Sequence, residues 1–265
     1  MAADAILALE DVVAGYGKMT ILHGTSFAVR RGTITTLIGP NGAGKSTIFK
    51  TVFGMLPARS GRVVFEGADI TNLGPRDLIA RSLSYVPQGR NIFPELSVRH
   101  NLELGAVMAP KGFDLASRMA AAFDRFPVLR RKADAQASTL SGGEQKMLEI
   151  ARGLLVEPKL MLIDEPSIGL SPIMANELFA ALTEMNGRGM TVLLIEQNAK
   201  RALELSHDGI VLELGRTRIA DTAKNILADA RIGQLFLGGG LAEESPSRPA
   251  GEVIGSGASG PARPQ

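Results

Sequence analysis

The segment from Gly39 to Thr47 constrains the possible fold of this chain more than any other part of the sequence. It reads Gly-Pro-Asn-Gly-Ala-Gly-Lys-Ser-Thr, a complete phosphate-binding loop pattern. An apolar run, Thr33 to Ile38, precedes it. The residues that follow have the spacing of one buried helix face: Ile48, Phe49, Val52, Phe53 and Leu56, before Pro57. The pattern therefore predicts a loop between a strand and a helix.

Such a loop binds polyphosphate because glycines let backbone N–H groups surround the anion, while the helix directs its positive end toward it. We expect Lys45 to reach the β- and γ-phosphates of a nucleotide and the hydroxyl of Ser46 to hold Mg²⁺. The expected nucleotide-binding residues of the loop are Gly39, Pro40, Asn41, Gly42, Ala43, Gly44, Lys45, Ser46 and Thr47.

Length and composition limit the alternatives. The chain has 265 residues, 45% of them hydrophobic, which suffices for one substantial core with a smaller attached lobe. Its 29 basic residues face 27 acidic ones spread along the sequence, so no basic stripe predicts a nucleic-acid partner. The absence of cysteine excludes disulfides and thiol catalysis. The first residues do not resemble a secretory signal, and no apolar run reaches the roughly 18 to 20 residues that span a bilayer, so any membrane role is expected to be peripheral.

Local patterns predict an α/β chain with an inserted helical piece. The expected strands are Leu7 to Val13, Thr25 to Val29, Ile34 to Ile38, Arg62 to Phe65, Leu160 to Ile163, Thr191 to Ile195 and Ile210 to Leu214. The clearest expected helices are Arg118 to Phe126, Gly142 to Leu155 and Ile173 to Met185. The helical piece spans about 93–157. The segment 238–265 is rich in Gly, Ser and Pro and predicts a disordered tail.

Two carboxylates follow the apolar strand Leu160 to Ile163. Asp164, at the strand's end, is placed to hold Mg²⁺ opposite Ser46, and Glu165 is placed to orient and deprotonate an attacking water. A strand that ends in Asp-Glu is common by itself. Downstream of a complete phosphate-binding loop, it predicts a hydrolytic site.

The sequence Leu-Ser-Gly-Gly-Glu-Gln from Leu140 to Gln145 stands directly before a predicted helix. Ser141 and Glu144 have the spacing of a capping box, which satisfies the first N–H groups of a helix. A capping box does not explain Gly142 and Gly143, because glycines weaken a first turn unless something approaches the backbone closely. We expect a phosphate to make that approach.

Leu140 to Gln145 resembles the signature motif of ATP-binding-cassette (ABC) ATPases, and the resemblance extends from about Leu7 to Leu237. It implies a P-loop NTPase core with an antiparallel β subdomain and an inserted helical subdomain, in an ABC ATPase domain at 1–237. It also implies ATP and Mg²⁺ as cofactors. In that family the signature serine and glycines, here Ser141, Gly142 and Gly143, contact the γ-phosphate bound by a second subunit, which implies a head-to-tail dimer.

Other positions follow or depart from the family pattern. Tyr16 resembles the aromatic residue that stacks on adenine, and Gln88 resembles the glutamine that reaches Mg²⁺ and the attacking water. Ser171 stands where most members have an aspartate, in the loop that crosses to the other subunit. Gln197 stands where a histidine usually contacts the γ-phosphate, and we expect its amide to donate a hydrogen bond there. The histidines of the chain, His23, His100 and His207, do not fit that position.

The sequence Glu196-Gln197-Asn198, the loop from Pro87 to Pro94 and the short length resemble the shorter ATPase subunit of branched-chain amino-acid importers, or of related urea and amide importers. The resemblance implies a subunit at the cytoplasmic face of the membrane. Its expected partners are transmembrane permease subunits, a second ATPase subunit, identical or a paralogue, and a solute-binding protein.

The alternative is a non-transport relative that acts in translation or DNA repair. Such proteins usually carry two cassettes or a long coiled-coil insertion. The segment 51–139 shows no sustained heptads, which favours the transport subunit.

Overall fold

A computed structural model describes residues 4–109, 112–229 and 232. Its central layer is a six-stranded sheet in the order β10-β9-β3-β8-β7-β6. The pairs β9/β3, β3/β8, β8/β7 and β7/β6 are parallel, and β10 is antiparallel to β9 at one edge. The strands are β3 (Ile34–Ile38), β6 (Leu83–Val86), β7 (Leu160–Asp164), β8 (Thr191–Ile195), β9 (Asp208–Glu213) and β10 (Arg216–Thr222).

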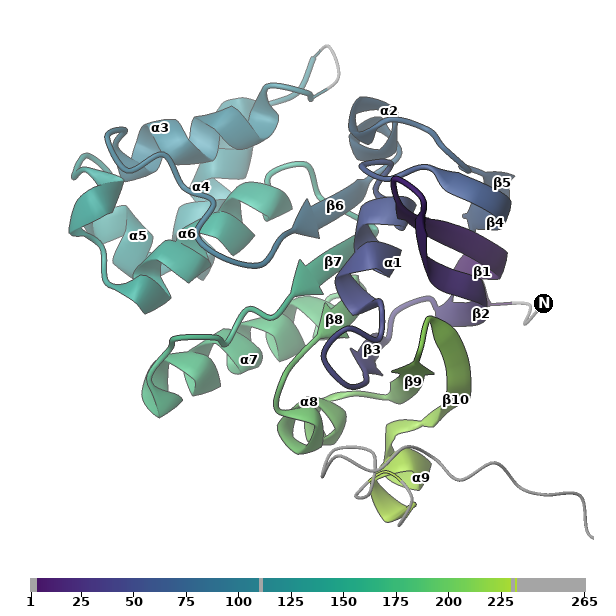
Figure 1. Ribbon diagram of the computed structural model, residues 1–265. Coiled ribbons are helices and arrows are strands. Elements are labelled where there is room, and N and C mark those ends of the chain that lie inside the picture. Colours follow the sequence, from purple (N-terminus) through teal and green to yellow (C-terminus); the bar gives the residue numbers. More distant parts are fainter. Residues whose placement is uncertain (1–3, 110–111, 230–231, 233–265) are drawn as a thin grey trace, which may run out of the picture.

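A second sheet is antiparallel and four-stranded, in the order β2-β1-β4-β5. Its strands are β1 (Ala5–Tyr16), β2 (Met19–Arg30), β4 (Ala58–Phe65) and β5 (Ala68–Asp69). Figure 1 shows this sheet on the opposite side of the molecule from helices α3 to α6.

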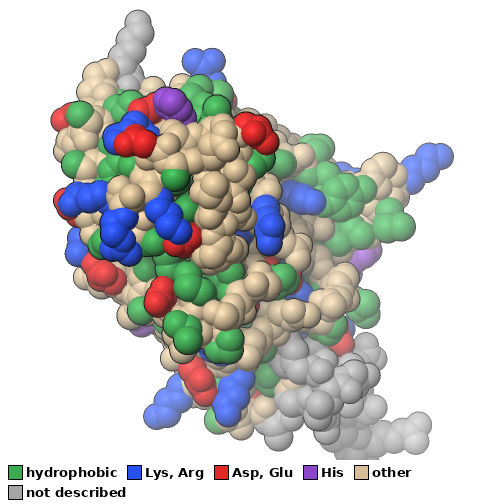
Figure 2. Space-filling view, turned by 90° about the vertical axis from the view of Figure 1, so that its left-hand side faces the viewer, with side chains coloured by type: hydrophobic (Ala, Val, Ile, Leu, Met, Phe, Trp, Pro, Cys, Tyr) green, Lys and Arg blue, Asp and Glu red, His purple; other side chains and the backbone are tan. Residues whose placement is uncertain are grey.

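The helices are α1 (Lys45–Val52), α2 (Pro75–Ala80), α3 (Val98–Glu103), α4 (Leu115–Arg125), α5 (Pro127–Arg131), α6 (Gly142–Leu154), α7 (Pro172–Gly187), α8 (Ala199–Leu205) and α9 (Ala223–Ala228), with 3₁₀ turns η1 (Leu104–Ala106) and η2 (Ala137–Thr139). Within the described ranges, none of them is long and apolar enough to cross a bilayer. Figure 2 views the molecule from the side of the left-hand helices of Figure 1, and basic and acidic side chains are interspersed on that face.

The central sheet separates two hydrophobic cores. Met161 and Ile163 of β7 pack into the core that contains α4, α6 and α7. Leu160 and Leu162 of the same strand pack into the core shared with α1 and the antiparallel sheet. Successive residues of a strand point to opposite faces, so a strand buried on both faces is apolar at every position. For that reason β7 is one unbroken apolar run up to Asp164.

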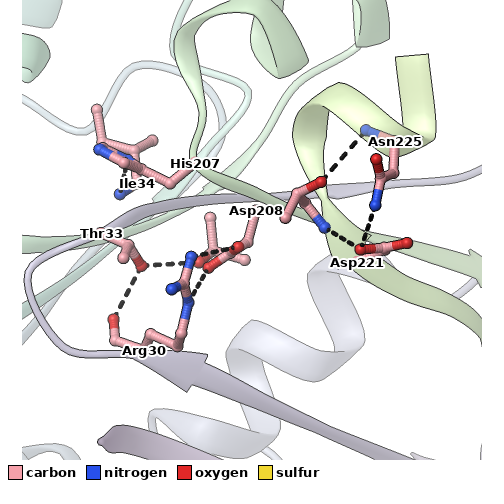
Figure 3. Close-up of polar contacts among 9 residues, drawn as sticks. Arg30, Thr33, Ile34, His207, Asp208, Asp221 and Asn225 are labelled. Carbon is pink, nitrogen blue, oxygen red and sulfur yellow. Dashed lines mark hydrogen bonds and ion pairs between the residues drawn. The ribbon is translucent and has the colours of Figure 1, made fainter. Parts of the chain in front are cut away.

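Polar contacts join the antiparallel sheet to the central sheet where β2 ends (Figure 3). Arg30 donates from Nε and Nη2 to the carboxylate of Asp208, at 2.8 and 2.7 Å. The N–H of Ile34 donates to Nδ1 of His207 at 3.1 Å. His207 therefore has a structural contact between β3 and the start of β9, while His23 and His100 are exposed on β2 and α3.

The α/β fold class with an antiparallel sheet and a group of inserted helices is confirmed. Every strand and helix expected from local patterns is present, several of them longer than expected. One boundary was wrong, because α1 ends at Val52 and not near Leu56. Gly54 has a φ of +69° and lies against the carbonyl of Leu73, which turns the chain out of the helix.

Phe53 and Leu56 are nevertheless buried, so the apolar spacing identified core residues beyond the helix end. The division of 1–237 into a core and a helical subdomain at about 93–157 stays a prediction. The predicted tail, 238–265, lies outside the described residues.

The turn between β9 and β10 connects the phosphate-binding loop to the antiparallel sheet through Gly215. The N–H of Gly215 donates to the carbonyl of Ala43 at 2.9 Å. Its own carbonyl accepts from the N–H of His23 at 2.9 Å and from the hydroxyl of Thr25 at 2.7 Å. Gly215 has a φ of +69°, and a Cβ there would lie 1.8 Å from the carbonyl oxygen of Ile21, so only glycine fits this turn.

We expect Gly215→Ala to lower the free energy of unfolding by about 2 to 5 kcal/mol. The cost of a left-handed backbone conformation for alanine adds to the cost of displacing β2 to make room for the Cβ. Urea denaturation followed by circular dichroism measures the change. Gly17→Ala is the matched control, because Gly17 has a φ of +54° with open space around its Cβ position, and should cost only about 1 kcal/mol. Equal losses in the two variants would contradict the steric explanation.

Candidate functional site

The candidate site lies at the carboxyl ends of parallel strands. The loop 39–47 follows β3, Gln88 follows β6 and Gln197 follows β8. Asp164 is the last residue of β7, and Glu165 comes directly after it. Because these strands run in the same direction, their carboxyl ends meet at one edge of the sheet. Four segments that are far apart in the sequence thereby approach one another.

The loop 39–47 has a backbone that depends on glycine. Gly42 and Gly44 have φ angles of +82° and +104°, and Gly44 is the N-cap of α1. A Cβ at Gly39 would lie 2.2 Å from the carbonyl oxygen of Leu212 on β9. The loop is therefore packed tightly against β9, and the first N–H groups of α1 have no side-chain cap. This is the arrangement in which a helix N-terminus binds an anion.

Lys45 is the first residue of α1 and is buried. Its Nζ donates to the carbonyl oxygens of Gly39 and Pro40 at 2.8 and 3.1 Å. Burial lowers the pKa of the ammonium, and the carboxylates of Glu165 and Asp164 act in the opposite direction. The lysine is thus held across the loop, with carboxylates near enough to favour its charged form.

Asp164 has the environment of a metal-binding carboxylate. It is buried, and its Oδ1 has no hydrogen-bond partner among the described residues. Its Oδ2 accepts from the hydroxyl of Tyr85 at 3.4 Å. Burial raises the pKa of Asp164, while the hydroxyls of Ser46 and Tyr85 and the ammonium of Lys45 oppose the rise.

These residues fit Mg²⁺, which proteins usually bind through one or two carboxylates together with substrate phosphates. Within the described residues, no group of three or more His, Cys, Asp and Glu side chains forms a metal site on its own. A Mg²⁺ ion held by Ser46 and Asp164 would complete its coordination with water and with the phosphates of a nucleotide.

Glu165 contacts Gln88 and adopts a strained backbone. The Nε2 of Gln88 donates to Oε2 of Glu165 at 2.6 Å. Glu165 has a φ of +47°, and its N–H donates to the carbonyl of Ile195 in β8. Burial raises the pKa of Glu165, the charge of Asp164 adds to the rise, and the charge of Lys45 opposes it. The direction of this pKa shift is the one that suits a general base.

A cavity of about 440 Å³ brings most of the predicted residues together. Gln88, Glu165 and Gln197 line it together with residues of the phosphate-binding loop. The other lining residues are Ile21, Asn41, Gly42, Gly44, Lys45, Ser46, Thr47 and Ile168. Gly39, Pro40 and Ala43 belong to the loop but do not line the cavity, and neither does Asp164, which is buried.

Gln197 is exposed, and its side chain makes no hydrogen bond within the described part of the chain. Its backbone is held instead: its N–H donates to the preceding carboxylate, Glu196, at 3.2 Å. Glu196 is buried and accepts from the N–H and hydroxyl of Ser167 at 3.0 and 2.7 Å. Burial raises the pKa of Glu196, and the hydrogen bonds from Ser167 and Gln197 oppose the rise.

Glu196 was not among the predicted site residues. It joins the loop after β7 to the loop after β8, beside Glu165 and Gln197. The available signal was a carboxylate directly after an apolar strand, the same signal that identified Asp164.

Ser141, Gly142 and Gly143 do not line the cavity around Lys45. The predicted capping box is present, since the Ser141 hydroxyl accepts from the N–H of Glu144 and Glu144 accepts from the N–H of Ser141. A Cβ at Gly143 would lie 2.3 Å from the side chain of Met174, so packing within the chain explains that glycine. At Gly142 the nearest atom would be 3.8 Å away, which leaves its backbone open to a ligand.

The two remaining predicted features lie outside the cavity. Tyr16 ends β1 and is 45% exposed, and Nζ of Lys50 lies over one face of its ring, 5.7 Å from the centroid. Ser171 is the N-cap of α7 and accepts from the N–H of Met174 at 3.4 Å. Serine and aspartate are both good N-caps, so the replacement of the usual aspartate preserves the start of α7.

Comparison with known proteins gives concordant matches. Residues 22–168 match the ABC transporter family. The high-affinity branched-chain amino acid transport ATP-binding protein BraG of Pseudomonas aeruginosa is 40% identical over 234 residues, which cover 88% of this chain and 100% of that protein. The probable branched-chain amino acid transport ATP-binding protein LivF of Archaeoglobus fulgidus is 37% identical, over 85% of this chain and 95% of that protein. The crystal structure of an ATP-binding cassette in its ADP conformation is similar at a TM-score of 0.78 and 31% identity, over 88% and 99% of the two chains.

We expect Lys45→Ala to weaken ATP binding by about 10-fold or more, because hydrogen bonds to a charged group contribute about 1.5 to 3 kcal/mol. Titration calorimetry with Mg²⁺-ATP measures the loss. Lys224→Ala removes the same charge from an exposed position on α9 and serves as the control. Parent-like affinity in Lys45→Ala would exclude contact between this lysine and the phosphates.

Proposed function

The chain belongs to the ABC transporter family of ATPases, and we propose that it is the ATP-hydrolysing subunit of an importer for branched-chain amino acids. The transported class rests on the names of BraG and LivF, to which the chain is similar over most of its length. We assign contact with the transported amino acid to none of the residues that line the cavity around Lys45. Substrate selection would belong to the permease and to a solute-binding protein.

The observation that carries the hydrolytic proposal is the contact between Gln88 and Glu165 in the same cavity as Lys45 and Ser46. The loop and Lys45 would bind the phosphates of ATP. Ser46, Gln88 and Asp164 would hold Mg²⁺, which neutralises phosphate charge during phosphoryl transfer. Glu165 would take the proton of the attacking water, and Gln88 would orient that carboxylate. Tyr16 would stack on the adenine.

A second ATPase subunit completes the proposed site. Gly142 presents open backbone, but it does not line the cavity around Lys45 within one chain. The proposal assigns Ser141, Gly142 and Gly143 to the γ-phosphate bound by the other subunit. ATP would then hold two chains together, because only the γ-phosphate contacts both, and its removal would let them separate.

A groove of about 670 Å³ supports docking to a transmembrane permease. It lies between the end of β6, the 3₁₀ turn η1 and helix α6, and it is lined in part by exposed apolar side chains, Phe93, Val107 and Met108. Exposed apolar side chains around a hollow mark protein interfaces. We propose that an apolar segment of the permease occupies this groove at the cytoplasmic face of the membrane.

Copurification from membranes of the source cell tests the assignment. The expected outcome is a complex that contains a permease, and the reconstituted complex should couple ATP hydrolysis to uptake of leucine, isoleucine or valine. Hydrolysis coupled to a different solute would contradict only the substrate class. A chain that copurifies with ribosomes or DNA-repair proteins would contradict the transport assignment.

We expect Glu165→Gln to lower turnover by about 10²- to 10⁴-fold while ATP binding survives, since an amide cannot accept the proton. Steady-state phosphate release and nucleotide titration measure the two effects separately. Glu204→Gln makes the same change at an exposed position on α8 and should leave both unchanged. Near-normal hydrolysis by Glu165→Gln would remove this residue from the role of general base.

We expect Gln197→Ala to lower turnover and Gln197→His largely to preserve it, because both glutamine and histidine can donate a hydrogen bond to the γ-phosphate. The histidine variant should add a pH dependence near the imidazole pKa of about 6.5. ATPase rates between pH 5.5 and 8.5 measure both effects. If Gln197→Ala keeps full turnover, another residue must sense the γ-phosphate.

A further inference from the structure

A buried ion pair lies on α6, one helical turn after its signature residues. The side chains of Lys146 and Glu149 are 8% and 2% exposed, and Nζ lies 2.5 Å from Oε2. A buried ion pair adds little net stability, because the cost of removing both charges from water offsets their attraction. Apolar side chains of similar volume are often equally stable in such places. Stability alone therefore does not account for this pair.

Both charged groups hold the backbone of the loop that follows β6. Nζ of Lys146 donates to the carbonyl oxygen of Gly89 at 2.8 Å. Oε1 of Glu149 accepts from the N–H of Asn91 at 2.5 Å. Arg152, three residues further along α6, donates to the carbonyl oxygen of Asn91. One face of α6 thus fixes the backbone on both sides of residue 90.

The fixed segment begins directly after Gln88. Gly89 has a φ of +93°, a left-handed conformation that orients the peptide joining it to Gln88. The amide of Gln88 donates to Glu165 at 2.6 Å. Gln88 itself is exposed, and its carbonyl oxygen accepts from Nδ2 of Asn91 at 3.2 Å, so the residue that α6 holds through its backbone also contacts Gln88.

We propose that the Lys146–Glu149 pair positions Gln88 against Glu165 and thereby makes hydrolysis depend on the position of α6. The inference rests on the proposed function, because it concerns turnover at Glu165. Neither residue of the pair lines the cavity around Lys45, so both are positioning residues. Glu149 also lines the groove assigned to the permease, so one side chain contacts both that groove and the loop that contains Gln88 and Asn91.

The double variant Lys146→Met, Glu149→Leu tests the proposal with apolar residues that should keep the fold. We expect an unfolding midpoint close to that of the parent, a KM for ATP within about twofold, and kcat lower by about 10-fold. Hydrogen exchange of the peptide that contains Asn91 should become faster, because its N–H loses its acceptor. Unchanged kcat and unchanged exchange would overturn the proposal.

The charge-reversed variant Lys146→Glu, Glu149→Lys separates positioning from simple stabilisation. It keeps a buried ion pair and the net charge, but it places an acceptor against the carbonyl of Gly89 and a donor against the N–H of Asn91. We expect kcat as low as in the apolar variant, while Lys146→Arg, which keeps the donor, should retain most of the parental kcat. Restoration of kcat by the reversed pair would overturn the proposal.

A double-mutant cycle with Gln88→Ala tests whether the ion pair affects turnover through Gln88. If the pair acts through Gln88, the apolar variant should cost less than about twofold in kcat when Gln88 is already alanine. An equal loss in both backgrounds would overturn that route. A parent chain that hydrolyses no ATP would contradict the proposed function, whereas an active parent with a fully active apolar variant would contradict this inference alone.

Discussion

The parallel pairing of β3, β8, β7 and β6 is the interaction on which the whole candidate site depends. It brings the loop 39–47, Gln88, Glu165 and Gln197 to one edge of the sheet, although they come from four separate segments. Parallel neighbours require crossover connections, and the helices that supply them cover the sheet. The same arrangement buries β7 and β8 on both faces, so the residues after these strands start from fixed positions.

Contacts between the loops then refine this position. Glu165 is tied to β8 through its N–H, and Glu196 holds Ser167 and Gln197 with one carboxylate. Buried carboxylates without enough cationic partners are costly, and burial raises their pKa values. A nucleotide with its metal would supply positive charge at Asp164 and new hydrogen-bond partners at the loop. The buried carboxylates of the site therefore favour the binding of a ligand that supplies the missing positive charge and hydrogen bonds.

Helix α6 connects three regions that would otherwise be independent. Its first turn carries the capping box and the open backbone of Gly142. Its second and third turns hold the loop after β6, and one side of the same helix borders the apolar groove. Because a helix moves nearly as a rigid body, a displacement at either end would reach the others. Gly143 has a different reason to be glycine, since Met174 of α7 packs against it.

Local sequence patterns were sufficient for the longer elements, for the loop 39–47 and for the two carboxylates at the end of β7, whereas the predictions for Gln88 and Gln197 came from the family resemblance. Strands such as β7 and β8 are continuous apolar runs, and Gly42, Gly44 and Ser141 encode local backbone conformations that few other residues allow. The sequences of short elements such as α2, α3 and β6 show no clear periodicity of apolar residues. Helices and strands of that length are stable only through tertiary packing.

The sequence by itself determined the local conformation of the loops for which we predict phosphate-binding and hydrolytic chemistry, because turns, caps and strand ends depend on neighbours within a few residues. Only the tertiary structure decided which of those loops touch. Three sets of contacts join segments about 30 to 80 positions apart in the sequence. They are the hydrogen bond between Gln88 and Glu165, the hydrogen bonds of Glu196 with Ser167, and the hydrogen bonds of Lys146 and Glu149 with the backbone of residues 89 and 91. Such contacts follow from the order of strands in the sheet, which no local pattern encodes.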